Sequence, residues 1–123
     1  MSSVREVWPA QVPAMVPGVP DYIRGVVWFG ERPVPVVDPA RFMKGPLLEF
    51  SARSCLVFIG DLEGKSVRGL LIDDVVGVLD AAVEYEQKGR KKTSPLLSPA
   101  YVIREGRRVA VIQVQALFRG TSV

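Results

Sequence analysis

Short apolar runs separated by polar turn residues make up most of the chain. Each run is rich in β-branched and aromatic residues, and Gly, Asp or Glu residues stand between the runs. This pattern predicts many short strands joined by tight turns, which is typical of an all-β barrel or sandwich. The predicted strands cover residues 26–29, 34–38, 54–60, 66–73, 75–79, 101–104 and 107–114.

Eight of the ten prolines lie in the first 46 residues. Proline recurs every three or four residues over residues 8–20, which excludes a regular helix and predicts an extended connector. The runs at 26–29 and 34–38 then predict a hairpin that turns at residues 30–32. Because proline cannot donate to a β-ladder, Pro35 must lie at an edge or where no donor is needed. Short helices are expected at residues 39–44 and 116–119.

Two of the predicted strands are apolar on both faces, at residues 70–72 and 109–112. A surface strand normally alternates apolar and polar residues, whereas a strand buried on both sides does not. Both segments are therefore predicted to lie between two packed β-units.

The length and composition indicate one globular domain over residues 1–123, with 48% hydrophobic and 24% charged residues. No apolar run approaches the roughly 18 to 20 residues that a membrane-spanning helix needs. The N-terminus carries no signal-peptide pattern. We therefore expect a cytoplasmic protein without direct membrane insertion.

Residue types that carry chemistry are scarce. The chain has no histidine, and it contains neither a phosphate-binding loop motif nor a CxxC or HExxH motif. Asp73 and Asp74 are adjacent carboxylates, but neighbours on a strand point to opposite faces. An enzyme using either of them would need a pocket that gathers further polar groups. We expect no catalytic residue, no metal and no cofactor.

The charge is uneven along the chain, whose net charge is +3. Residues 88–108 hold seven Lys and Arg residues against Glu105, a local charge of +6, so the remainder carries −3. This distribution allows an alternative function, a small basic β-barrel that binds nucleic acid through residues 88–108. Residues 88–98 contain no aromatic side chain for base stacking, so a solvated loop is the simpler interpretation.

Four segments resemble, in order, the motifs of the CheW-like domain family. They are Val4-Arg5-Glu6-Val7 (V-x-E-V), the proline-glycine segment of residues 16–27, Val34-Pro35-Val36-Val37-Asp38 (V-P-V-I-D), and the strand of residues 71–78. The resemblance covers most of the chain, from Val4 to Phe118. It implies two small packed five-stranded SH3-like β-barrels. It also implies a non-catalytic adaptor that couples chemoreceptor tips to a CheA-type histidine kinase in a chemotaxis-like two-component pathway.

The resemblance also implies a partner-binding face made of Val4, Glu6, Gly25, Phe29 and Arg32. Glu6 and Arg32 would supply charge complementarity, Phe29 an apolar anchor, and Gly25 a close approach. The family's L-R-G turn falls on residues 29–31, so Gly30 stands where the family has arginine, with Arg32 nearby as a substitute. The structural alternatives are that Gly25 only permits a turn and that Phe29 belongs to the core.

Few residues precede the V-x-E-V motif in this sequence. We therefore expect the first barrel to be incomplete and to leave an open strand edge. That edge could be closed by residues 102–104, by a homodimer, or by a strand from a partner protein.

Overall fold

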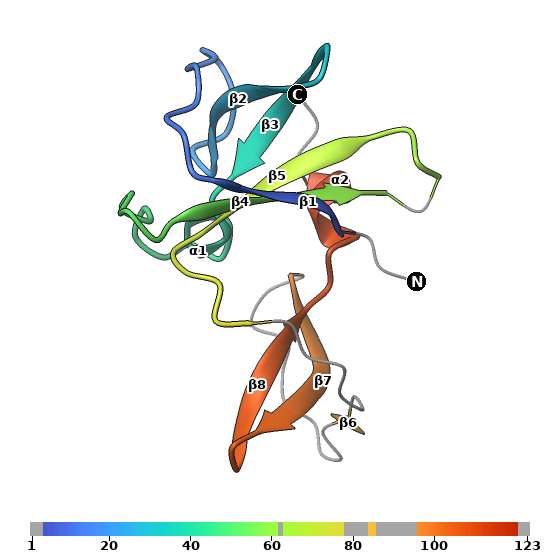
Figure 1. Cartoon of the computed structure of the whole chain (residues 1–123). Coiled ribbons are helices and arrows are strands. Elements are labelled where there is room, and N and C mark those ends of the chain that lie inside the picture. Colours follow the sequence, from blue (N-terminus) through green and yellow to red (C-terminus); the bar gives the residue numbers. More distant parts are fainter. Residues whose placement is uncertain (1–3, 62, 78–83, 86–95, 121–123) are drawn as a thin grey trace.

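A computed structural model of the chain describes residues 4–61, 63–77, 84–85 and 96–120. This part of the chain contains eight strands and two short helices (Figure 1). The elements are β1 (Val4–Pro9), β2 (Ile23–Phe29), β3 (Arg32–Val37), α1 (Pro39–Phe42), β4 (Cys55–Gly60), β5 (Val67–Ile72), β6 (Glu84–Tyr85), β7 (Leu97–Arg104), β8 (Arg107–Ile112) and α2 (Ala116–Gly120).

The first sheet has five strands in the order β1-β4-β5-β3-β2. All neighbouring strands are antiparallel except β3 and β5, which pair in parallel at Val36 and Val37. Strand β1 is one of the two outer strands of this sheet, and within the described residues no ladder joins it to β2, the other outer strand.

Pro35 is compatible with the predicted hairpin because the backbone groups of the residue opposite it form hydrogen bonds with another segment of the chain. Pro35 stands opposite Val26 in the β2–β3 register. The N–H and C=O of Val26 both bond to Ala14 in the connector, at 2.9 Å each. Val26 therefore needs no donor from Pro35, as the sequence predicted. These bonds also hold the connector against the outer edge of β2.

Strand β5 contributes to two hydrophobic clusters. Leu71 packs with Leu56 and Phe58 inside the first sheet, while Leu70 packs with Ile59 on the other side. Both leucines are buried, so the prediction of a strand covered on both faces is confirmed for residues 70–72. The same prediction is wrong for residues 109–112. These residues lie in β8, where Val109 is 41% exposed, because within the described residues β8 is an outer strand of its sheet.

The second sheet has the order β6-β7-β8 within the described residues. Its hairpin of β7 and β8 extends away from the first sheet (Figure 1). The two sheets share one core, in which Leu96 and Leu117 of α2 pack against Leu70. Arg68 of β5 lies over the ring of Phe118, 5.2 Å from its centroid. Burial lowers the pKa of this guanidinium, and the charge of Asp61 opposes the shift.

The all-β class with short helices and two packed β-units is confirmed. One predicted strand is wrong, because residues 75–77 form no strand; its last two residues, 78 and 79, lie outside the described part. Residues 84–85 form the short strand β6, which was not predicted, and β7 begins at Leu97, inside the segment interpreted as a solvated loop. In the described part of the chain, α1 and α2 are both far too short to cross a membrane.

Candidate partner-binding surface

Strand β1 and the β2–β3 hairpin meet across an aromatic cluster of Trp8, Phe29 and Phe58. The Trp8 ring lies 5.5 Å from the Phe29 ring and 4.5 Å from the Phe58 ring, centroid to centroid, and Phe29 stacks on Phe58 at 4.6 Å. Phe58 is fully buried, whereas Trp8 and Phe29 are partly buried and pack against the same core cluster. The cluster therefore closes the space between the two outer strands of the sheet and reaches the surface.

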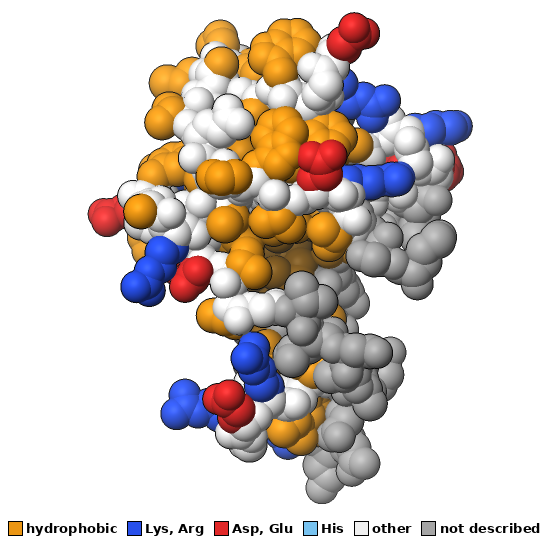
Figure 2. All heavy atoms as spheres, viewed as in Figure 1, with side chains coloured by type: hydrophobic (Ala, Val, Ile, Leu, Met, Phe, Trp, Pro, Cys, Tyr) orange, Lys and Arg blue, Asp and Glu red, His pale blue; other side chains and the backbone are white. Residues whose placement is uncertain are grey.

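Charged side chains lie around this cluster. The indole nitrogen Nε1 of Trp8 donates to Oε2 of Glu6 at 2.6 Å. Arg32 stands directly opposite Phe29 in the hairpin register, and its guanidinium donates to the carbonyl of Lys65 at 3.3 Å. Hydrophobic side chains with acidic and basic neighbours gather over this part of the molecule (Figure 2). Three of the five predicted site residues, Glu6, Phe29 and Arg32, are thus brought together.

The other two predicted site residues are Val4 of β1 and Gly25 of β2. Val4 begins β1 opposite Ile59 and is 47% exposed. Gly25 is buried in β2 with φ at +137°, and a Cβ at this position would collide with the carbonyl oxygen of Ala14. Its close approach is therefore to the connector of the same chain.

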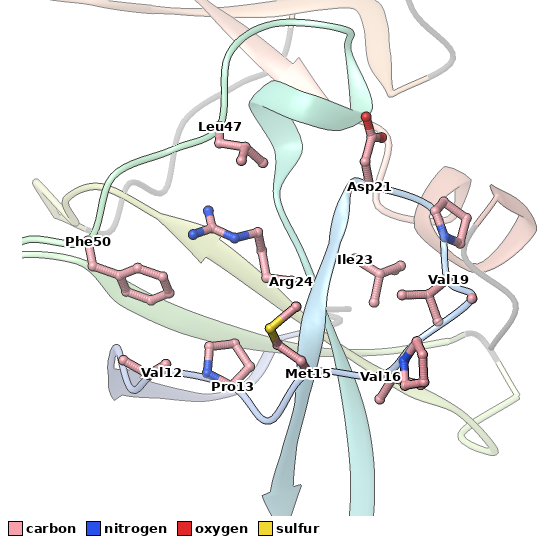
Figure 3. A pocket seen from close by; sticks show the side chains of 13 residues that line it. Val12, Pro13, Met15, Val16, Val19, Asp21, Ile23, Arg24, Leu47 and Phe50 are labelled. Atoms are coloured by element: carbon pink, nitrogen blue, oxygen red, sulfur yellow. The ribbon is translucent and has the colours of Figure 1, made fainter.

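A groove of about 520 Å³ runs along the connector, and the sequence analysis did not anticipate it (Figure 3). Its lining is mostly apolar, and the Met15 side chain is 90% exposed. Arg24 lies between Leu47 and Phe50, 5.0 Å from the centroid of the Phe50 ring. The sequence did carry a signal for this groove, namely the valines and the methionine between the prolines of the connector. An extended connector leaves such apolar side chains uncovered.

The structure gives less support to the nucleic-acid-binding alternative and to a site at Asp73 and Asp74. Residues 88–92 lie outside the described part, which leaves Arg104, Arg107 and Arg108 on the β7–β8 hairpin. The guanidinium of Arg108 lies 4.6 Å from the centroid of the Tyr101 ring. Asp73 and Asp74 are exposed and do not line the connector groove. Within the described residues, no three His, Cys, Asp or Glu side chains are grouped as metal ligands would be.

Comparison with known proteins decides the family. The model of the CheW-like domain matches residues 1–122. The chain belongs to the CheW-like domain family. Its structure is similar to the crystal structure of the scaffolding protein TtCheW from Thermoanaerobacter tengcongensis, with a TM-score of 0.75 and 18% sequence identity. The alignment covers 94% of this chain and 80% of TtCheW. No curated protein sequence matches the chain.

Membership of the CheW-like family supports a scaffold or adaptor role in chemotaxis-type signalling. Proteins of this family are scaffolds rather than enzymes. The aromatic cluster and the charges around it suit such a role, because large amphipathic aromatic rings and arginine are enriched at the centres of protein interfaces.

Proposed function

We propose that this CheW-like protein is a non-catalytic cytoplasmic adaptor that couples chemoreceptors to a CheA-type histidine kinase. The observation that carries the proposal is the surface formed by Glu6, Phe29 and Arg32 around the aromatic cluster. The parts of the Trp8 and Phe29 rings that reach the surface offer an apolar anchor. The opposite charges of Glu6 and Arg32 offer orientation.

The hairpin turn bears on the receptor contact. Gly30 has φ at +64°, and the space where its side chain would stand is open. Arg32, two residues later, offers a positive charge nearby, on an exposed side chain whose guanidinium donates to the carbonyl of Lys65. We propose that the receptor tip contacts Val4, Glu6 and Arg32, and that Gly25 supports this surface only through the connector.

The test is isothermal titration calorimetry with the regulatory domain of a CheA-type kinase from the same organism. The variants are Phe29→Ala and Arg32→Glu, and Trp28→Ala is the matched control. Trp28 is 64% exposed and adjacent to Phe29, and successive strand residues point to opposite faces. We expect Phe29→Ala to weaken binding by about 2 kcal/mol, roughly thirtyfold, as for a central aromatic anchor. Trp28→Ala should leave the affinity unchanged.

Each variant is checked for native folding by circular dichroism before titration. Equal losses for Phe29→Ala and Trp28→Ala would place the interface elsewhere. If the unmodified protein does not bind the kinase, the coupling function is refuted. Affinity for single-stranded RNA that falls steeply with salt would then favour the nucleic-acid alternative, through Arg104, Arg107 and Arg108.

A further inference from the structure

A β-bulge in β1 determines where the side chain of Arg5 lies. The residues on either side of Arg5 stand opposite consecutive residues of β4, Phe58 and Ile59, so Arg5 is the extra residue of the bulge. A bulge leaves its extra residue outside the regular ladder and can redirect a side chain. The exposed side chain of Arg5 reaches the last residue of β4, where its guanidinium lies over Gly60.

Gly60 leaves the space that this guanidinium fills. A Cβ on Gly60 would lie 2.5 Å from Nε and 2.8 Å from Nη2 of Arg5. The same Nη2 lies 3.6 Å from the Cβ position of Gly64, in the turn between β4 and β5. The backbone therefore restricts the positions of a long side chain. An arginine that is restricted before binding loses less conformational entropy when a partner contacts it.

Arg32 brings a second guanidinium to the same turn. Its Nη1 donates to the carbonyl of Lys65, the residue after Gly64, at 3.3 Å. Both arginine side chains are exposed. The starts of β1 and β3, which are separated in sequence, thus each place a guanidinium against consecutive residues of the β4–β5 turn.

The acidic side chains of the turn are engaged with other groups. Glu63 pairs with Lys65 at 3.6 Å, and Asp61 accepts the backbone N–H of Lys65 at 2.8 Å. Among the described residues, no ion pair includes Arg5 or Arg32. Two like charges at one turn do not stabilise the fold. They do complement a partner that supplies carboxylates.

We propose that Arg5 and Arg32 form a two-arginine site that binds acidic side chains of the receptor tip. The inference rests on the proposed adaptor function and adds Arg5 to the surface proposed for the receptor. Each guanidinium can hold a carboxylate through two parallel N–H donors, so the site selects and orients acidic residues. Arg32 stands opposite Phe29 in the hairpin register, so the two-arginine site adjoins the apolar anchor.

The test is isothermal titration calorimetry with a fragment of the cytoplasmic tip of a chemoreceptor from the same organism. Arg5→Ala should weaken binding by roughly tenfold, because it removes a charge-assisted contact. Gly60→Ala should weaken binding by a similar factor, because the added methyl group displaces the guanidinium although the charge remains. The φ of Gly60 is not positive, and the displaced atoms end a flexible side chain. Gly60→Ala should therefore keep its thermal stability.

The double variant Arg5→Ala/Gly60→Ala separates this effect from a disturbance of the fold. If Gly60 acts through Arg5, the double variant should bind no more weakly than Arg5→Ala alone. Arg53→Ala is the charge-matched control, because Arg53 is exposed and precedes the opposite end of β4. It should leave the affinity unchanged.

Additive losses in the double variant would overturn the proposal, because Gly60 would then act independently of Arg5. Unchanged affinity in Arg5→Ala would overturn the two-arginine site and leave the adaptor function in place. Absence of binding by the unmodified protein would refute the receptor contact itself, and the two-arginine site with it.

Discussion

At the residue scale, Asp38 is a fully buried carboxylate held by three donors. Arg24 donates to Oδ2 at 2.9 Å, the backbone N–H of Leu48 to Oδ2 at 2.8 Å, and the N–H of Arg41 to Oδ1 at 3.1 Å. The last of these bonds caps α1, and the other two tie β2 and residue 48 to the end of β3. A single side chain thus fixes the junction of three segments.

We expect Asp38→Ala to lower the free energy of unfolding by about 3 to 5 kcal/mol, because it leaves the guanidinium of Arg24 without its buried partner. Asp21→Ala is the control, since its ion pair with Arg41 is exposed and should contribute less than about 1 kcal/mol. Urea denaturation followed by circular dichroism measures both. Similar losses in the two variants would contradict this account of Asp38.

Gly25 and Gly30 offer a second comparison at this scale. Both have positive φ, but only Gly25 meets neighbouring backbone where a Cβ would stand. We expect Gly25→Ala to destabilise the protein more strongly, because it displaces Ala14 and breaks the two bonds to Val26. Gly30→Ala should cost about 1 kcal/mol, the strain of the backbone alone. Thermal unfolding compares them, and a smaller loss at Gly25 than at Gly30 would refute the structural role.

At the element scale, β5 links the two hydrophobic clusters. Replacing either Leu70 or Leu71 by alanine should lower stability by about 2 to 5 kcal/mol, although the two side chains pack in different clusters. Because the backbone is shared, tryptophan fluorescence and circular dichroism should report one common transition in each variant. Transitions that separate in Leu70→Ala but not in Leu71→Ala would show that the clusters unfold independently.

The same element scale explains what the pattern of residues could and could not predict. Apolar residues on both faces correctly placed β5 inside the molecule, because it has a neighbouring strand on each side and a cluster on each face. The same pattern misplaced β8, because covering an edge strand depends on other elements packing against it. A local sequence pattern carries no information about those elements.

At the scale of the whole molecule, the turn chemistry and strand spacing were enough to predict an all-β fold, and the strands apolar on both faces indicated two packed units. They did not show that residues 4–9 pair with β4, because that pairing joins segments about 50 residues apart. For the candidate surface too, contacts between residues near in sequence were predictable and contacts between distant segments were not. Phe29 and Arg32 were predictable as neighbours across a turn, whereas the contact between Trp8 and Phe29 requires the folded sheet to bring its two outer strands near each other. The connector groove was missed for a similar reason, since Leu47 and Phe50 reach it only in the folded chain.

The position of β5 between two clusters also bears on how this sequence can change over generations. Alternate side chains of the strand enter different clusters, so inserting or deleting one residue within Val67–Ile72 would exchange the two sets. A single substitution in β5 affects the packing of one cluster, whereas the insertion or deletion of one residue disturbs both clusters at once. Lineages of this protein should therefore vary in length at exposed turns such as Gly30-Glu31, and keep the length of β5 constant.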